Sequence, residues 1–309
     1  MARERESAPA QRDAGLSLVI PAYDEEQAIG SVVAEARSVL EGLGVPWEVL
    51  VVDDHSRDRT GALAEAAGAR VIRNVQNGGY GYSLMQGILR ARHPAVAILD
   101  GDGSYPVDRI PKLFQEYQRG NAMVVGRRQG AHYATSPRMR LLRWLFSSMT
   151  SFIVGRSVPD VNSGMRVFER EAVLPLFPHM SNGFSFTTSI TLLFMMRALP
   201  VGYVPIEYHQ RSGSSKVSYW RDSLRALQII ASITARLNPI KLFLLAALVN
   251  LALLLPLVAV FAWIGDAGGL LIGVIETSAV LVGLGFVVEA LVDKSVLARP
   301  GTGRDREPR

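Results

Sequence analysis

Short runs of apolar, β-branched residues alternate with longer amphipathic stretches from residue 16 to about residue 210. The runs predict strands at 16–20, 47–52, 70–72, 95–99 and 122–125, and the stretches between them predict helices at 26–43, 58–67, 81–92 and 107–119. Strands that alternate with helices form βαβ units, so the pattern predicts an α/β domain on a mainly parallel, doubly wound sheet. Ligands of such sheets bind beyond the carboxyl ends of the strands.

Two long apolar stretches dominate the last third of the chain. Residues 242–263 carry no charge, and as a helix they would span roughly 30 Å of hydrocarbon. Residues 267–288 follow after a short connection and contain one acid, Glu276. The pattern predicts a hairpin of two transmembrane helices, and the alternative is a pair of buried helices in a soluble protein. An acid inside a span is costly, so we expect Glu276 to serve structure or contact between copies rather than chemistry.

Basic residues flank the two spans on the same side. Arg236 and Lys241 precede the first span, and the connection between the spans has no basic residue. The second span is followed by Lys294, Arg299, Arg304, Arg306 and Arg309. Because basic residues stay on the cytoplasmic side, we expect a multi-pass protein of the cell (inner, cytoplasmic) membrane with both termini and the α/β domain in the cytoplasm. The first 15 residues are polar, which predicts no signal peptide.

The residues just before the first span predict an amphipathic helix, with apolar side chains at helical spacing and arginines around them. This helix either lies in the membrane interface or packs on the α/β domain. The predicted organisation is a flexible N-terminus at 1–15, the α/β domain at 16–217, the amphipathic helix at 218–237, the transmembrane hairpin at 238–292 and a basic tail at 293–309.

Composition narrows the candidate chemistry. The 309 residues are 49% hydrophobic and 20% charged, with a mean hydropathy of +0.18, whereas an average soluble domain carries about 25% charged residues. Cysteine is absent from the sequence, which excludes disulfides, thiolate metal sites and a cysteine nucleophile. The net charge of +5 suits a membrane surface or a phosphorylated ligand, and we expect no nucleic-acid partner.

Acidic residues follow three of the predicted strands. The first strand runs into three acids at 24–26, the second into Asp53 and Asp54, and the fourth into Asp100 and Asp102. A dinucleotide-binding fold would place a Gly-x-Gly-x-x-Gly turn after the first strand, where these acids would repel a pyrophosphate, so NAD and FAD are disfavoured. Asp100 and Asp102 stand two residues apart on a glycine-rich loop and can hold Mg²⁺ or Mn²⁺ while substrate phosphates complete the coordination. This is the chemistry of a nucleotide-diphosphate leaving group.

Seven segments in this order resemble those of the Asp-x-Asp glycosyltransferases of family 2, and within it the polyprenyl-phosphate glycosyltransferases related to dolichyl-phosphate mannose synthase. They are VIPAYDEE, VVDDHSRDRT, NGGYGYSLMQGI, LDGDGSYP, VVGRR, DVNSGMRVF and RSGSSK, between residues 16 and 220. The resemblance implies a GT-A fold. It also implies inverting, metal-dependent transfer of a sugar from a UDP- or GDP-linked nucleotide sugar to a polyprenyl phosphate on the cytoplasmic face of the membrane. The hairpin agrees with those members that carry their own membrane anchor.

The resemblance also implies roles for individual residues. The implied metal ligands are Asp100 and Asp102. The residues implied to bind the nucleotide sugar are Pro21, Tyr23, Glu25, Asp54, Asp100 and Arg127. Arg211, Ser214 and Lys216 form a basic loop for the acceptor phosphate, and the catalytic set is Asp102, Asp160, Arg211 and Lys216. Arg138 and Arg140 lie in a basic amphipathic stretch, which predicts either a helix that meets the lipid phosphate or an internal helix with solvated arginines.

Asp160 and Tyr80 leave alternatives open. An acceptor phosphate is already ionised at neutral pH, so we expect Asp160 to position the acceptor or the sugar, with general base as the alternative. Tyr80 stands where many relatives have a lysine, which leaves the sugar and the nucleotide undecided. Other hypotheses are a transferase with a hydroxyl acceptor, such as a glycan or diacylglycerol, and a catalytically inactive membrane scaffold. The two spans also offer a surface for homo-oligomer formation.

Overall fold

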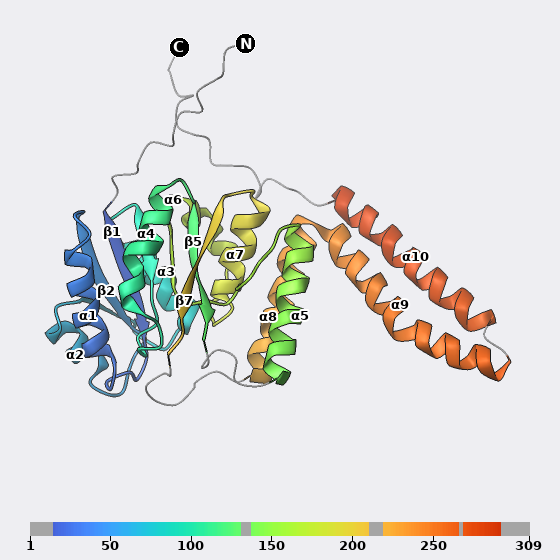
Figure 1. The fold of residues 1–309 in the computed structure, drawn as a ribbon, viewed down its shortest axis with the longest axis horizontal. Helices are drawn as coiled ribbons and strands as arrows, with labels where there is room; N and C mark the ends of the chain where they lie inside the picture. Colours follow the sequence, from blue (N-terminus) through green and yellow to red (C-terminus); the bar gives the residue numbers. More distant parts are fainter. Residues whose placement is uncertain (1–14, 131–136, 210–218, 266–267, 292–309) are drawn as a thin grey trace, which may run out of the picture.

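A seven-stranded sheet in the order β3-β2-β1-β4-β6-β5-β7 forms the centre of the protein (Figure 1). This computed structural model describes residues 15–130, 137–209, 219–265 and 268–291. The strands are β1 (Leu16–Ala22), β2 (Trp47–Asp53), β3 (Arg70–Arg73), β4 (Ala95–Ile98), β5 (Met123–Gln129), β6 (Arg166–Glu169) and β7 (Val201–Glu207). Strand β6 runs antiparallel to both β4 and β5, and the other paired strands run parallel. The expectation of a mainly parallel α/β sheet is therefore confirmed.

The strand order reverses at β1. Leu16 pairs with Trp47 of β2 on one side and with Ala95 of β4 on the other. The chain thus builds the sheet first through β2 and β3, and then returns to the other side of β1 through β4. The loops that follow β1 and β4 lie at this switch point, which is where ligands of open α/β sheets bind.

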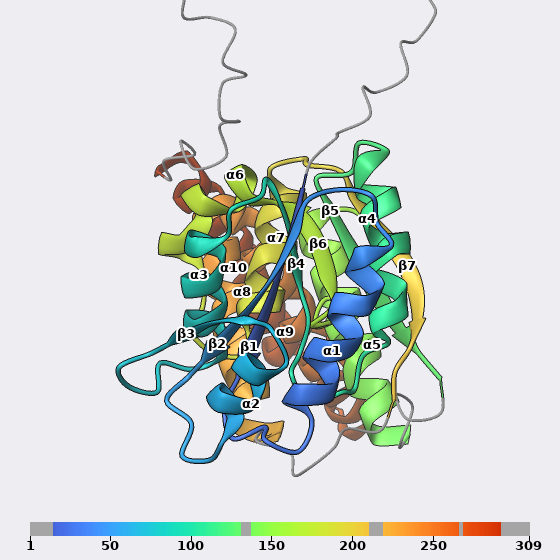
Figure 2. The same cartoon turned by 90° about the vertical axis from the view of Figure 1, so that its left-hand side faces the viewer.

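Helices cover both faces of the sheet (Figure 2). One face carries α1 (Ile29–Glu41), α2 (Thr60–Ala66), η1 (Val107–Arg109) and α4 (Ile110–Gln118). The other face carries α3 (Tyr80–Arg90), α6 (Arg170–Val173), η2 (Leu174–His179) and α7 (Phe186–Met196). Helix α1 buries Ile29, Val32, Val33, Ala36 and Leu40, the apolar stripe of its 3.6-residue period. Strand β1 is buried along its whole length, as expected of a parallel strand covered on both sides.

Two further helices, α5 (Pro137–Val154) and α8 (Tyr219–Leu237), pack against α7. Within the described part of α8, Ile230, Ile233 and Leu237 are buried in the core. Helix α5 instead exposes large apolar side chains, since Leu141 and Trp144 are 56% and 62% exposed.

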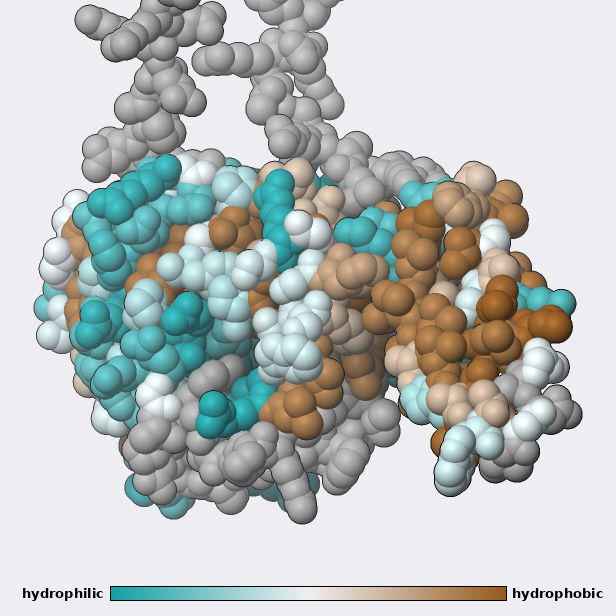
Figure 3. Space-filling model, turned by 45° about the vertical axis from the view of Figure 1, so that its right-hand side comes forward, coloured by the Kyte–Doolittle hydropathy of each residue, from teal (hydrophilic) through white to brown (hydrophobic). Residues whose placement is uncertain are grey.

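Helices α9 (Pro239–Ile264) and α10 (Gly268–Leu291) form an antiparallel hairpin that projects from the α/β domain (Figure 1). Both are long and apolar enough to cross a membrane, and their most apolar windows are only 11% and 17% buried. The alternative of buried core helices therefore does not hold. Figure 3 shows the hairpin surface as predominantly hydrophobic. Asn250 donates from Nδ2 to Ser278 Oγ at 3.0 Å between the two helices, and Glu276 is exposed on α10.

Lys241 connects the base of the hairpin to α5. Its Nζ donates to the carbonyl oxygens of Phe152 at 3.1 Å and Ile153 at 2.9 Å, in the last turn of α5. The last carbonyls of a helix have no partner inside the helix, and a cation there also interacts favourably with the helix dipole. Lys241 therefore caps α5 from the first turn of α9.

Candidate functional site

The loops that follow β1 and β2 are hydrogen-bonded to each other. The backbone N–H of Glu25 donates to Thr60 Oγ1 at 2.7 Å, and the backbone N–H of Arg57 donates to Asp24 Oδ1 at 2.8 Å. Pro21 is buried, whereas Tyr23 and Glu25 are half-buried in the loop after β1. The structure thus brings together three residues of the predicted nucleotide-binding set.

Asp54, another member of that set, holds the glycine-rich loop that follows β3. The Asp54 side chain accepts hydrogen bonds from Asn74 Nδ2 at 2.7 Å, from the N–H of Gly78 at 2.9 Å and from the N–H of Gly79 at 2.8 Å. The residue is 4% exposed, so the structure assigns this carboxylate to the loop. A Cβ on Gly81 would lie 2.1 Å from the carbonyl oxygen of Ser181, so the start of α3 sits directly on the loop before α7.

Asp100 lies just beyond the carboxyl end of β4. Tyr80, at the start of α3, donates from its hydroxyl to Asp100 Oδ1 at 2.7 Å, and its ring stacks on Phe184 at 5.4 Å between centroids. Burial and the neighbouring Asp100 carboxylate raise the pKa of Tyr80 well above its usual value, so the hydroxyl stays protonated and donates. A Cβ on Gly164 would lie 2.6 Å from Asp100 Oδ2, so only glycine leaves room for the carboxylate.

Asp102 is buried in the loop after Asp100. Its Oδ1 accepts hydrogen bonds from the backbone N–H of Ser104 at 2.9 Å and from Ser104 Oγ at 2.6 Å. The N–H of His209, just beyond β7, donates to the carbonyl oxygen of Ser104 at 2.9 Å. The end of β7 therefore lies against the acidic loop, and residues 210–218 follow it directly in the chain.

The carboxylates at this edge suit a metal ion that is bound together with phosphates. In the described part of the chain, no group of three or more His, Asp or Glu side chains is arranged to hold an ion. Mg²⁺ is commonly bound through one or two carboxylates while substrate phosphates and water supply the other ligands. Asp100 and Asp102 fit this arrangement, because both carboxylates lie at the switch point where a diphosphate would bind.

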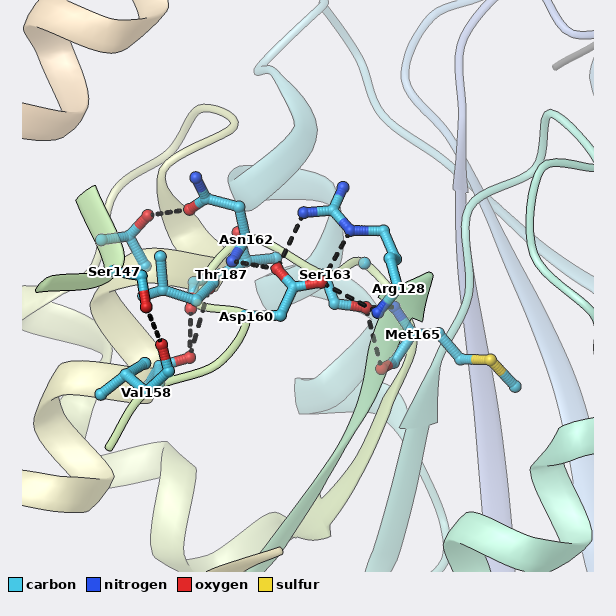
Figure 4. Close-up of polar contacts among 12 residues, drawn as sticks. Arg128, Ser147, Val158, Asp160, Asn162, Ser163, Met165 and Thr187 are labelled. Atoms are coloured by element: carbon cyan, nitrogen blue, oxygen red, sulfur yellow. Dashed lines mark hydrogen bonds and ion pairs between the residues drawn. The ribbon is translucent and has the colours of Figure 1, made fainter. Parts of the chain in front are cut away.

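Arg128 and Asp160 form a buried ion pair beside this loop (Figure 4). Arg128 donates from Nε and Nη2 to the two carboxylate oxygens, at 2.9 Å each, and its backbone N–H donates to Oδ2 at 3.1 Å. The backbone N–H of Asn162 donates to Oδ1 at 3.2 Å. The side chain of Asp160 is 2% exposed and that of Arg128 is 16% exposed. The guanidinium also lies 5.7 Å from the centre of the Tyr208 ring.

These contacts bear on the two roles considered for Asp160. Burial would raise the pKa of Asp160, but the Arg128 charge and the N–H donors outweigh it and hold the pKa below its usual range. A carboxylate with a low pKa, whose two oxygens accept from fixed donors, takes up a proton poorly. The geometry therefore favours a positioning role over that of a general base.

Arg128 was not among the residues predicted from sequence, whereas its neighbour Arg127 was. Successive residues of a strand point to opposite faces, and Arg127 is exposed at the end of β5 while Arg128 is half-buried against Asp160. Arg140 is exposed on α5. The side chain of Arg138, and all of Arg211, Ser214 and Lys216, lie outside the described residues. The predicted acceptor loop therefore stays a prediction.

The mainly parallel seven-stranded sheet, covered by helices on both faces, has the α/β architecture of the GT-A fold. The model of glycosyl transferase family 2 matches residues 17–177, and the chain belongs to this family. It is therefore a glycosyltransferase, and the expected family, fold and enzyme class are confirmed.

Two of the similar proteins are named as transferases of dolichyl phosphate. The dolichyl-phosphate hexose transferase of Haloferax volcanii is 34% identical over 203 residues, which cover 65% of this chain and 86% of the relative. The dolichyl-phosphate β-glucosyltransferase of Saccharomyces cerevisiae is 28% identical over 241 residues, covering 68% of this chain and 71% of the relative.

Solved structures share the fold. Glucosyl-3-phosphoglycerate synthase of Mycobacterium tuberculosis, in complex with Mn²⁺, UDP and glucosyl-3-phosphoglycerate, superposes with a TM-score of 0.57 at 22% identity, covering 74% of this chain and 82% of that one. The same enzyme in complex with Mg²⁺ and UDP gives a TM-score of 0.56 at 22% identity, with the same coverage.

Proposed function

We propose that this glycosyltransferase transfers a sugar, with inversion, from a nucleotide sugar to a polyprenyl phosphate at the cytoplasmic leaflet of the membrane in which its hairpin is anchored. One observation carries the proposal. A single chain combines two carboxylates at the switch point of a GT-A sheet with an apolar hairpin whose outer surface is exposed. The names of the relatives support a phosphorylated polyprenol as the acceptor.

The donor would bind at the switch point, over the carboxyl ends of β1 and β4. Tyr23 and Glu25 would border the base and ribose, and Asp54 would shape the glycine-rich loop beneath them. Asp100 and Asp102 would hold a divalent ion, Mg²⁺ or Mn²⁺, which neutralises charge on the diphosphate when bound. The Tyr80 hydroxyl would hold the Asp100 carboxylate in place for this task, and Gly164 leaves the room that the carboxylate needs.

In the transfer step, the main task of the protein would be to position the donor sugar and the acceptor phosphate. An oxygen of the acceptor phosphate would form a bond to the anomeric carbon as the bond to the nucleoside diphosphate breaks, and the electron pair would leave with the diphosphate. The acceptor is already ionised, so no proton has to be removed. Arg211 and Lys216 would stabilise the negative charges that meet in this step, and the Arg128–Asp160 pair would position the neighbouring wall of the site.

The direct test uses the purified full chain in lipid nanodiscs with a panel of UDP- and GDP-sugars, Mn²⁺ and a short polyprenyl phosphate. Mass spectrometry of the lipid should show one hexose added through a phosphodiester. Asp102→Asn and Lys216→Ala should abolish the product, and Asp108→Asn, which changes an exposed acid on η1, should retain it. Full activity of Asp102→Asn would overturn the site, and transfer to a hydroxyl acceptor without transfer to the phosphate would overturn the acceptor.

A further inference from the structure

A cavity of about 670 Å³ lies between η2, α7 and the second half of α8. Its wall includes His179, Met180, Leu193, Ile229, Ile233 and Arg236. The volume falls in the range of pockets that hold small organic ligands, roughly 300–1,000 Å³. The mechanism proposed above does not use this cavity.

The chemistry of the wall points to an amphiphile with a negative group. Leu193, Ile229 and Ile233 make its interior apolar. Arg236 is exposed at its edge and, within the described residues, its side chain makes no hydrogen bond or ion pair. A guanidinium in this position is available for bidentate hydrogen bonding to a phosphate. The His179 side chain lines the same cavity.

The cavity lies at the level of the membrane surface in the proposed arrangement. Arg236 stands three residues before Pro239, where α9 begins. Basic pockets at the cytoplasmic end of membrane helices bind the headgroups of anionic lipids. We propose that this cavity binds one acyl chain of an anionic phospholipid, with its phosphate on Arg236. The proposal rests on the membrane anchoring proposed above.

The position along α8 separates this site from that of the acceptor. Helix α8 begins at Tyr219, directly after the predicted acceptor loop, and Ile233 lies roughly 20 Å farther along the helix at its rise of about 1.5 Å per residue. The cavity is thus a second lipid site rather than the place where the acceptor phosphate meets the donor.

The test is photolabelling of the full chain in phosphatidylcholine nanodiscs that contain a small share of phosphatidylglycerol with a diazirine on one acyl chain. Labelled peptides should be enriched at residues 178–181 and 229–237. Arg236→Gln should lower this labelling roughly fivefold, the contribution of one basic residue near an anionic surface. Ser232→Phe, which fills the cavity from its wall, should lower it as well. Arg156→Gln removes an exposed charge that does not line the cavity, and it should change nothing.

Several outcomes would overturn the proposal. The first two are absence of label from the cavity peptides and equal labelling by a phosphatidylcholine probe. The other two are an equal loss of labelling in Arg236→Gln and Arg156→Gln, and displacement of the label by excess polyprenyl phosphate. Labelling of α9 and α10 by the same probe reports membrane insertion independently. Their labelling without cavity labelling refutes the lipid site alone, whereas failure to label them refutes the membrane anchoring.

Discussion

Replacement of Asp160 by asparagine tests whether the buried ion pair positions the site or supplies a base. Asn keeps the shape of the side chain but removes the charge that pairs with Arg128 through two contacts of 2.9 Å. Removal of one partner of a buried ion pair costs about 3–5 kcal/mol. Arg128 keeps some contact with solvent, at 16% exposure, so we expect a loss near the lower end, about 3 kcal/mol. For a domain of this size that loss lowers Tm by roughly 6–12 °C.

Thermal melts at one scan rate measure the stability effect, with Asp108→Asn as the control for loss of an exposed acid. The double variant Arg128→Met/Asp160→Asn should recover part of the Tm lost in Asp160→Asn, because it leaves no unpaired charge while the Asn oxygen still accepts from a backbone N–H. The folded pKa of Asp160 lies below its unfolded value, so the pair stabilises fully above about pH 5 and loses its effect as the pH falls through the lowered pKa. Transfer rates should therefore show no acid limb from Asp160 between pH 5.5 and 8. An unchanged Tm in Asp160→Asn, or an acid limb near neutral pH that this substitution removes, would refute the positioning role.

Three further substitutions probe contacts of the site and the hairpin. Tyr80→Phe removes the 2.7 Å hydrogen bond to Asp100, so the Mn²⁺ concentration needed for half-maximal UDP binding in calorimetry should rise about fivefold; an unchanged titration would show that the hydroxyl does not hold the carboxylate. Gly164→Ala places a Cβ 2.6 Å from the same carboxylate and should abolish Mn²⁺-dependent UDP binding, whereas Gly30→Ala, which enters open space, should not. Lys241→Met removes two charged hydrogen bonds to α5 and should cost about 2 kcal/mol, measured as a Tm roughly 4–8 °C lower; a Tm equal to that of the parent chain would contradict the capping role.

Sequence periodicity was sufficient for the first five of the seven strands, and β6 and β7 were not predicted. Strands β1 to β5 are apolar runs separated by amphipathic helices, and the acids after β1, β2 and β4 meet because parallel strands end at one edge. Strand β6 was not predicted, because it is only four residues long and starts with an arginine. That Arg166 is fully buried and donates to Thr191 Oγ1 at 2.9 Å, a contact with a helix 25 residues away.

The same limit applies to individual site residues. The acids at the strand ends were predicted from their positions, but the partners of Asp54, Asp100 and Asp160 lie at least 20 residues away in the sequence. Asp54 bonds Gly79, and Asp160 bonds Arg128, across 25 and 32 residues. Which carboxylate faces a ligand and which holds a loop depends on these long-range pairings, and no local pattern encodes them.

The contact of Lys241 with α5 makes the membrane hairpin part of the folded catalytic domain. The sequence suggests a clean division after residue 237, yet the carbonyls at the end of α5 depend on a side chain beyond that point. Because α5 also packs against α7, loosening of α9 would reach the helix layer that backs the sheet. A chain shortened at residue 237 would therefore be a less stable protein rather than a soluble version of the same enzyme. Tilting of the hairpin in a thinner or thicker bilayer would act on the α/β domain through this ammonium group as well as through the packing of α9 on α8.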